Sequence, residues 1–435
     1  MLLIDPTPPL LPPLLFPFSL RIIGLQERSM KVAEQTTTAV ERVLKIQWWQ
    51  EDCERESHSD LSDNEIYILF SITFACAFFE NVISNANPLS YEAIFNFGDS
   101  ISDTGNAEAS YPPLDKNSPY GSTYFKHPSG RMSNGRLIID FIAEAYGLPF
   151  LTPYLNPTKD HGDIKKGVNF AFAGSSALDM DYFIRTGVKL PPSNMSLSVQ
   201  LNWFKKLKPS LCKSKEECDI YFKQSLFIVG EIGGNDVFSL VKVKTVGELR
   251  EIVPLIVESI SKTATALIEE GAVELVVPGN FPLGCNAAVL GIVNSKKKED
   301  YDESGCLIAY NAFTEYFIEQ LKSSIETLKQ KHPQAKIIYF DYYNNVKRLY
   351  QEPQQYGFTS DKVEIMKACC GGSGPYHVDE KFCGGPGTTV CSDPSKLINW
   401  DGNHLTEAAY KLIAKGLVEG PFASPSLKTA PFKIT

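Results

Sequence analysis

Five apolar runs bounded by turn residues recur along the chain from about residue 91. They are rich in Val, Ile and Phe, and most of them lack a strict alternation of apolar and polar positions. Strands that are buried on both faces have this pattern, whereas strands with one face in water alternate. We therefore predict buried strands at 92–97, 167–173, 225–232, 272–279 and 335–342.

Segments with helical periodicity lie between these runs. We predict a helix over 134–147, a second from Thr245 to Gly271 that Pro254 interrupts, and a third over 306–331. Thr245 begins a "TVGE" stretch, whose capping-box spacing marks a helix start. Strands that alternate with helices form a parallel sheet covered on both faces. The predicted fold class is therefore α/β, in a single domain over residues 91–425.

The first 90 residues follow a different pattern. Residues 1–65 are rich in proline at the start and acidic at the end, and we expect them to form a disordered extension. Residues 66–86 contain a short apolar core followed by small residues, which is typical of a signal peptide and too short for a membrane span. An acidic run precedes this core where a basic one is usual. A short membrane-surface or anchor helix, and an N-terminus extended by a misplaced start, are therefore the alternatives.

Composition and charge narrow the class of function. The 435 residues carry a net charge of -9, and 43% of them are hydrophobic, as in ordinary globular proteins. The acidic balance and the lack of a Lys/Arg-rich run argue against nucleic-acid binding. One glycosylation sequon begins at Asn194, which fits a secreted protein.

The chain contains ten cysteines, eight of them in the predicted domain. An even number with short spacings predicts disulfides and an oxidising compartment. Eight cysteines allow on the order of 100 pairings, so the sequence assigns none. Zinc is the alternative for "CCGGSGPYHVDEKFC", which includes His377, but paired CxxC knuckles and an HxxxH partner are missing. The eight are Cys212, Cys218, Cys285, Cys306, Cys369, Cys370, Cys383 and Cys391.

Small polar residues crowd the end of the first apolar run, in "FNFGDSISDTGN". Ligands of parallel sheets bind beyond the carboxyl ends of the strands, which is where Ser100 stands. A serine on such a strand-to-helix turn is a candidate nucleophile, and amides exposed in the turn can hold a developing negative charge. The alternative is a plain turn whose Asp, Ser and Asn residues cap a helix.

A serine nucleophile needs a base, and the base needs an orienting group. Among the six histidines, His404 stands out because it follows Asp401 by three residues in "DGNH". A carboxylate at that spacing can bind ring Nδ1 and leave the other nitrogen to accept the serine proton. Apolar positions with helical spacing follow, so the alternative is an Asp and a His that merely cap that helix.

Two more motifs follow the second and third apolar runs. Gly174 in "NFAFAGSSA" and Asn235 in "GEIGGND" can each donate a hydrogen bond to an oxyanion. Alternatively, the neighbouring glycines simply serve a turn and Asn235 bonds the backbone. The chain has no GxSxG, GxGxxG or GxxxxGK[ST] motif, which disfavours an α/β-hydrolase nucleophile elbow and the common phosphate-binding loops.

"FNFGDSISDTGN", "GVNFAFAGSSA", "GGND" and "DGNH" resemble, in this order, the four motif blocks of the SGNH, or GDSL, hydrolases. Further segments, among them "VVPGNFPLGC" and "ACCGGSGPYH", are similar to the plant secreted GDSL esterase/lipase branch. Within that branch the chain is most similar to the group of acetylajmalan esterase and sinapine-esterase-like proteins. The resemblance covers residues 91–422. It implies a three-layer α/β/α sandwich, flavodoxin-like, with a five-stranded parallel sheet.

The resemblance also implies roles for the candidate residues. Ser100 is the nucleophile, His404 the general base and Asp401 its orienter, while the Ser100 amide, Gly174 and Asn235 form the oxyanion hole. Ala173 stands where many plant members carry another glycine, which leaves the local backbone geometry open. The implied activity is that of a serine esterase that cleaves acyl esters of small plant metabolites or lipids through an acyl-enzyme, without a cofactor or a metal.

From these observations we expect a monomer that is secreted to the apoplast or vacuole. Its ligand is a small ester, and the mature protein has no stable membrane span and no nucleic-acid partner. Acyl transfer to an alcohol uses the same residues and stays open as an alternative. A catalytically silent binding protein of the same fold is a further alternative, which the intact Ser100, Asp401, His404 and Asn235 disfavour.

Overall fold

The computed structural model of the chain describes residues 90–112, 115–159 and 162–435. They belong to one compact unit, Pro88–Thr435. The predicted extension 1–65 and the predicted signal segment 66–86 lie outside the described residues. Within the compact unit the chain continues past residue 425, the predicted end of the domain, and the Phe432 amide donates to the Ala145 carbonyl.

A seven-stranded sheet forms the centre of this unit, in the order β2-β3-β1-β4-β5-β6-β9. The five predicted strands are all present as β3, β1, β4, β5 and β6 and run parallel to one another, which confirms the α/β class and the parallel core. Two unpredicted strands of two residues each extend the edges, and β9 is antiparallel to β6. The strands of this sheet are β1 (Ala93–Phe97), β2 (Thr152–Pro153), β3 (Gly167–Asn169), β4 (Ser225–Val229), β5 (Glu274–Pro278), β6 (Lys336–Phe340) and β9 (Ala423–Ser424).

Two predicted strands end earlier than expected. The run 167–173 is a strand only to Asn169, because its later amides bond side chains: the Ala171 amide donates to Asn169 and the Ala173 amide to Asp103. The run 225–232 is a strand only to Val229. In both places the apolar pattern continues into a loop at the carboxyl end of the sheet, where the candidate site lies.

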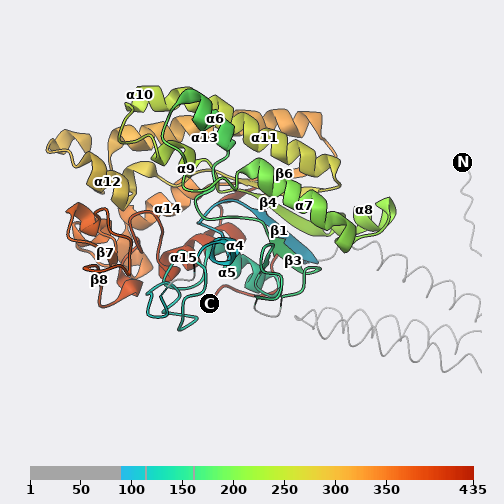
Figure 1. Cartoon of the computed structure of the whole chain (residues 1–435), viewed down its shortest axis with the longest axis horizontal. Helices are drawn as coiled ribbons and strands as arrows, with labels where there is room; N and C mark the ends of the chain where they lie inside the picture. Colours follow the sequence, from blue (N-terminus) through green and yellow to red (C-terminus); the bar gives the residue numbers. More distant parts are fainter. Residues whose placement is uncertain (1–89, 113–114, 160–161) are drawn as a thin grey trace, which may run out of the picture. The chain divides into compact units, whose positions relative to one another are not determined.

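Helices cover both faces of the sheet. On one side α15 contacts α5 and α14, and on the other α11 contacts α7 and α13, so that the unit has three layers (Figure 1). The α-helices in the described residues are α4 (Asn106–Ser110), α5 (Ile138–Ala145), α6 (Met180–Thr186), α7 (Leu197–Leu211), α8 (Lys215–Lys223), α9 (Gly234–Phe238), α10 (Val246–Leu249), α11 (Val253–Glu269), α12 (Ala287–Val293), α13 (Ile308–Lys331), α14 (Tyr342–Gln351) and α15 (Glu407–Val418). None of these described helices has the length and apolar character to cross a membrane.

The predicted helix from Thr245 to Gly271 consists of three pieces. Thr245 and Glu248 form the expected capping box at the start of α10. A short 3₁₀ turn follows, and Pro254 then occupies the first turn of α11. Proline fits there because the first amides of a helix have no intrahelical acceptor. Pro254 therefore begins a helix instead of interrupting one.

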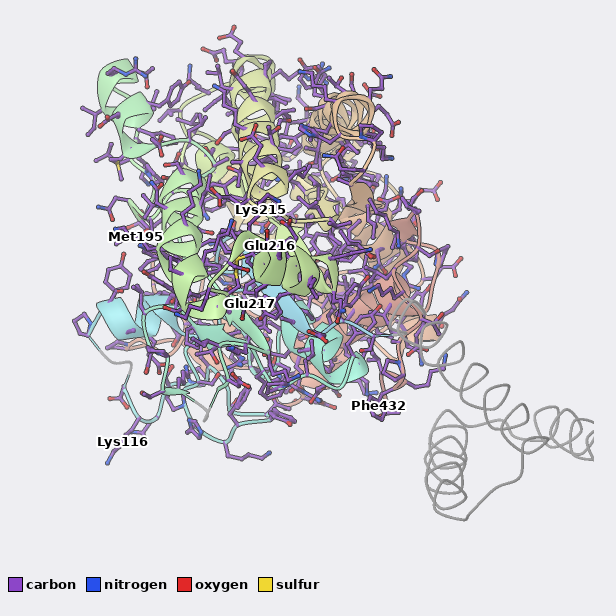
Figure 2. The ribbon with its side chains drawn as sticks, turned by 90° about the vertical axis from the view of Figure 1, so that its right-hand side faces the viewer. Lys116, Met195, Lys215, Glu216, Glu217 and Phe432 are labelled. Atoms are coloured by element: carbon purple, nitrogen blue, oxygen red, sulfur yellow. A yellow bond between two sulfur atoms is a disulfide. The ribbon has the colours of Figure 1, made fainter. Side chains whose placement is uncertain are left out.

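All eight cysteines of the predicted domain are paired. The disulfides are Cys212–Cys218, Cys285–Cys306, Cys369–Cys391 and Cys370–Cys383. The first joins the end of α7 to α8, whose opening residues Lys215, Glu216 and Glu217 are labelled in Figure 2. The last two disulfides include all three cysteines of the stretch "CCGGSGPYHVDEKFC". No cysteine of this stretch is therefore left to bind zinc, and the zinc alternative is wrong. Four disulfides are consistent with a secreted protein.

Candidate active site

Ser100 lies in the turn between β1 and α4, which we call the serine loop (residues 98–107). Buried polar side chains fix this loop. Asp103 accepts hydrogen bonds from four backbone amides, those of Gly105, Asn106, Ala107 and Ala173, at 2.7–3.0 Å. The small polar residues of this loop thus form a hydrogen-bonded network. Asp103 also caps α4, as expected from the alternative interpretation of this stretch as a turn whose polar residues cap a helix.

Two asparagines join the serine loop to the segment after β3. Asn106 Nδ2 donates to the Asn169 and Ala171 carbonyls, and Asn169 Nδ2 donates to the Ser102 carbonyl. All three polar side chains at the centre of the network, Asp103, Asn106 and Asn169, are fully buried. Because buried polar groups are costly to leave unpaired, this network holds the loop in one conformation.

His404 reaches Ser100 from the segment before α15, which we call the histidine loop (residues 399–406). Ser100 Oγ lies 2.8 Å from His404 Nε2, although 304 positions separate the two residues. His404 Nδ1 lies 2.7 Å from Asp401 Oδ2, and Asp401 Oδ1 accepts the backbone amides of Asn403 and His404. The three side chains therefore form a hydrogen-bonded series from serine hydroxyl to imidazole to carboxylate.

Electrostatics supports a charged Asp401 and a basic His404. Burial alone would raise the pKa of Asp401, but the charge of His404 and the hydrogen bonds from His404 and Tyr120 outweigh it and lower that pKa to about 2. Burial would lower the pKa of His404, and the nearby Asp401 carboxylate outweighs it, so the His404 pKa rises above its usual 6.5. The Asp401 carboxylate is thus ionised throughout the neutral pH range, and the His404 imidazole is a stronger base than an ordinary histidine side chain.

Tyr120 supplies a third contact to Asp401. Its hydroxyl donates to Asp401 Oδ2 at 2.6 Å, and its ring stacks on Phe382 and meets Trp400 edge-on. The rings of Tyr120 and Trp400 belong to a small hydrophobic cluster, separate from the main core, that also contains Cys369, Cys370 and Cys383. The cluster joins the disulfide-bonded segment to the histidine loop, since the Cys369 and Cys370 amides donate to the carbonyls of Asn399 and Trp400.

Gly174 and Asn235 line the same cavity as Ser100. Gly174 has a φ of +83°, and a Cβ placed on it would lie 2.8 Å from Pro192, so that the turn requires glycine. Asn235 Nδ2 donates to the Ser175 carbonyl at 2.8 Å and to Asp99 Oδ2 at 3.2 Å. Within the described residues, the amides of Ser100 and Gly174 have no hydrogen-bond acceptor.

A cavity of about 550 Å³ lies over these groups and is bounded by Ser100, Gly174, Asn235 and His404. Its remaining wall is mainly apolar and includes several aromatic rings, which suits an organic ligand with few polar groups. Apolar residues on this wall include Tyr111, Met132, Phe238, Phe281, Phe313 and Phe317.

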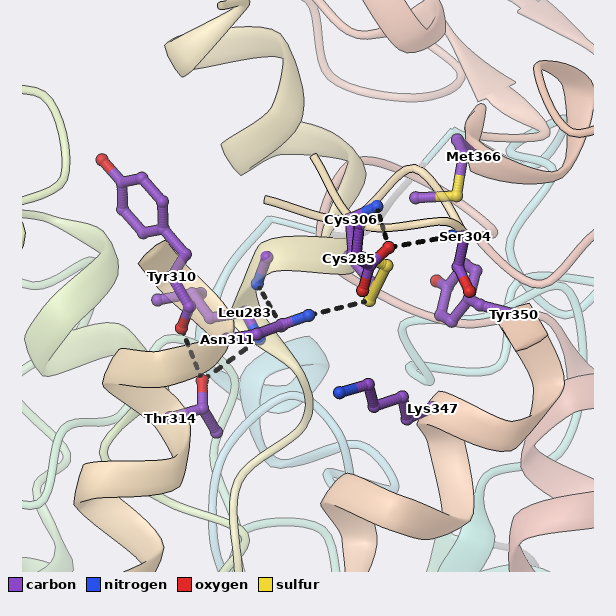
Figure 3. Close-up of a disulfide and its surroundings, with 12 residues drawn as sticks. Leu283, Cys285, Ser304, Cys306, Tyr310, Asn311, Thr314, Lys347, Tyr350 and Met366 are labelled. Atoms are coloured by element: carbon purple, nitrogen blue, oxygen red, sulfur yellow. Dashed lines mark hydrogen bonds between the residues drawn. A yellow bond between two sulfur atoms is a disulfide. The ribbon is translucent and has the colours of Figure 1, made fainter. Parts of the chain in front are cut away.

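One wall of this cavity is held by the disulfide Cys285–Cys306 (Figure 3). Asn311 on α13 accepts a hydrogen bond from the Gly284 amide and donates to Cys285 Sγ. One turn further along α13, Thr314 accepts from the Leu283 amide. The segment that contains Phe281 is therefore attached to the helix that carries Phe313 and Phe317, so these rings form a connected wall.

The residues that the sequence predicted as catalytic lie together at this cavity: Ser100, Gly174, Asn235 and His404 line it, and Asp401 contacts His404. Asn194, the predicted glycosylation site, is exposed before α7, and its glycosylation stays a prediction. Sequence reasoning missed Tyr120 and Glu231, which also lines the cavity. The signal for Glu231 was present, because it is the one charged residue in the apolar run "SLFIVGEI". Tyr120 gave no such signal.

Comparison with known proteins agrees with this geometry. The model of the GDSL-like lipase/acylhydrolase family matches residues 94–417. The chain belongs to this family. As lipases and acylhydrolases cleave carboxylic esters, the predicted enzyme class, carboxylic ester hydrolase, is confirmed for this GDSL hydrolase.

Similar curated relatives cover most of the chain. A GDSL esterase/lipase of Arabidopsis thaliana is 45% identical over 372 residues, which cover 83% of the chain and 99% of the relative. A second GDSL esterase/lipase of Arabidopsis thaliana is 44% identical over 364 residues, which cover 82% of the chain and 94% of the relative. The sinapine esterase of Brassica napus is 44% identical over 345 residues, with 77% and 87% covered. This GDSL hydrolase is thus similar to plant enzymes over nearly their whole length.

Proposed function

We propose that the protein is a serine esterase in which Ser100, His404 and Asp401 act as a catalytic triad. The observation that carries the proposal is the 2.8 Å separation of Ser100 Oγ and His404 Nε2. In the first step Ser100 Oγ attacks the acyl carbon of the ester while His404 takes its proton. The imidazolium then protonates the leaving alcohol, and an acyl-enzyme remains.

In the second step water attacks the acyl-enzyme. His404 takes a proton from this water, the tetrahedral intermediate collapses, and Ser100 recovers its proton as the acid leaves. Asp401 holds the ring so that Nε2 faces the serine, and its charge stabilises the imidazolium that forms in each step. The same geometry serves an alcohol as acceptor, so product analysis with a competing alcohol separates hydrolysis from acyl transfer.

The oxyanion that forms in each step needs donors near Ser100. We propose the amides of Ser100 and Gly174 and the side chain of Asn235 for this role, each contributing about 3 kcal/mol in the transition state. Both Asn235 hydrogens already have acceptors, and the longer bond, to Asp99, is the one that a developing oxyanion replaces. We also propose that the protein prefers esters of small metabolites, that it is secreted, and that Asn194 is glycosylated.

Substitution of the nucleophile tests this proposal. We expect Ser100→Ala to lower kcat for p-nitrophenyl acetate on the order of 10⁴-fold or more, because no nucleophile remains. A fluorophosphonate probe should label the wild-type protein at Ser100, as read by peptide mass spectrometry. Ser102→Ala is the matched control, because Ser102 lies in the same loop and its hydroxyl accepts a hydrogen bond from Asn96 on β1 instead of bonding the imidazole. Unchanged hydrolysis in the Ser100 variant, or labelling elsewhere, contradicts the assignment.

A further inference from the structure

Gln200 is a fully buried amide on α7, the helix that packs on the sheet beside β1 (Figure 1). The other buried residues of α7 are apolar, and the Phe204 ring, one turn further along, meets Phe97 of β1 edge-on. Among such neighbours a polar side chain is costly unless its atoms are hydrogen-bonded. The hydrogen bonds of Gln200 therefore indicate why a polar residue occupies this position.

The Gln200 amide bonds both main-chain groups of Gly98, where the serine loop begins. Its Oε1 accepts the Gly98 amide at 2.9 Å, and its Nε2 donates to the Gly98 carbonyl at 2.8 Å. Gly98 directly follows β1 and precedes Ser100 by two residues. A primary amide offers an acceptor and a donor side by side, as the main chain of a neighbouring strand does. Gln200 thus fixes the point from which the chain turns to the nucleophile.

The same Nε2 also reaches the segment that contains Gly174. It lies 3.2 Å from Ser175 Oγ and 3.1 Å from the Met195 carbonyl, to which the Ser175 hydroxyl donates as well. Ser175 follows Gly174, and the Ser175 carbonyl accepts the side-chain amide of Asn235 at 2.8 Å. Gln200 does not line the cavity. One side chain outside the cavity therefore joins the two segments that carry the proposed oxyanion donors.

We propose that Gln200 is a positioning residue that holds the three oxyanion donors at the spacing that a tetrahedral intermediate requires. This inference rests on the proposed esterase function. Gln200 touches neither the substrate nor the reacting atoms: it acts through Gly98 on the Ser100 amide, and through Ser175 on the other two donors. Because these donors bind the oxyanion most strongly in the transition state, an error in their spacing lowers kcat and leaves KM nearly unchanged.

Gln200→Met tests the proposal, because it keeps the length of the side chain and removes its hydrogen bonds. A displacement of about 1 Å can cost on the order of 100-fold in rate, and we expect kcat for p-nitrophenyl acetate to fall about 30-fold, with KM changed less than about twofold. A trifluoromethyl ketone, whose adduct with Ser100 places an oxyanion among the same donors, should bind more weakly by about the same factor.

The pH profile of the same variant gives a second readout. Among the described residues, no hydrogen bond joins Gln200 to His404 or Asp401. The midpoint of the acid limb should therefore stay at its wild-type value while the plateau falls. A shifted midpoint overturns the inference, because it would mean that the substitution acts on the base and not on the oxyanion donors.

Asn345→Leu is the matched control. Asn345 is an equally buried amide that joins α14 to α15, where its Nδ2 donates to the Ile413 carbonyl, and it does not line the cavity. This variant should lower the urea midpoint of unfolding as Gln200→Met does, and leave kcat and inhibition by the ketone unchanged. An equal fall of kcat in both variants overturns the inference, because loss of stability alone would then explain it.

An unchanged kcat in Gln200→Met, or a lower kcat without weaker binding of the ketone, also overturns the inference. If that variant does not fold, Ser175→Ala decides, because it removes the hydroxyl through which Gln200 reaches the Gly174 segment. In Ser175→Ala, kcat and the affinity for the ketone should fall together by about fivefold, and wild-type values overturn the inference. These outcomes refute only the role of Gln200, whereas the absence of Ser100-dependent hydrolysis in the wild-type protein refutes the esterase function itself.

Discussion

Ser100 and His404 reach the cavity from two regions that are built differently. The serine loop follows the first strand of the central sheet, and buried hydrogen bonds fix it, four of them to the single carboxylate of Asp103. The histidine loop lies beside the segment that contains the disulfides Cys369–Cys391 and Cys370–Cys383. There covalent cross-links and a small aromatic cluster, with Tyr120 at its centre, provide the support.

This difference has consequences for mutation. The serine loop depends on polar groups that have no access to water, so a change of one atom leaves several donors unpaired. The histidine loop depends on packing and cross-links, and the one hydrogen bond that Asp401 accepts from a described residue outside the loop comes from the buried Tyr120 hydroxyl. We therefore expect substitution of Asp103, Asn106 or Asn169 in the first region to reduce both stability and activity, and the removal of a single hydroxyl in the second to act mainly on catalysis.

Among substitutions that leave the three triad residues in place, the largest effect is expected for Asp103→Asn. The amide that replaces one carboxylate oxygen turns a donor toward two backbone amides, which lowers the free energy of unfolding by about 2–4 kcal/mol. Because the Ala173 amide is one of the four donors, Gly174 also moves, and kcat/KM should fall about 100-fold. Denaturant unfolding and p-nitrophenyl acetate kinetics measure the two effects.

Asp341→Asn is the control for this prediction, since Asp341 accepts a single exposed backbone amide at the start of α14. It should lower the free energy of unfolding by about 1 kcal/mol or less and leave the kinetics unchanged. A stable, active Asp103→Asn protein would show that the network does not hold the serine loop.

The same contrast explains how much could be predicted from the sequence. The serine loop was predictable because its signals are local: an apolar run, a cluster of turn residues, and a serine at the end of a strand. The strands β2 and β9 were missed because two residues carry no pattern. The contact between Tyr120 and Asp401 joins positions 281 apart, and many disulfide pairings were open, so the support of the histidine loop depends on tertiary packing that a single sequence does not reveal.

A smaller effect is expected for Tyr120→Phe. The variant keeps the ring against Phe382 and Trp400 and removes only the hydrogen bond to Asp401. We expect kcat to fall about tenfold, as for the loss of one hydrogen bond to a charged group. A carboxylate with one donor fewer also attracts the imidazolium more strongly, so the acid limb of the pH–rate profile should move to higher pH.

Tyr350→Phe is the matched control, because the buried Tyr350 hydroxyl bonds Asn399 in the histidine loop and does not touch Asp401. It should cost a similar free energy of unfolding and leave the acid limb in place. Equal shifts of the limb in both variants would mean that Tyr120 supports the loop only through packing.

The smallest expected change in rate is the pH dependence of kcat/KM in the wild-type protein. His404 acts as a base only when neutral, so kcat/KM must rise with pH through the pKa of its imidazolium. Asp401 raises that pKa above 6.5, which places the midpoint of the rise above 6.5. Asp401 itself, with a pKa of about 2, stays ionised and adds no second limb in the neutral range. Intrinsic fluorescence recorded over the same range excludes unfolding as the cause. A flat profile, or a midpoint below 6.5, would mean that a carboxylate close to this imidazole does not set its basicity, and the proposed coupling between the two groups would be wrong.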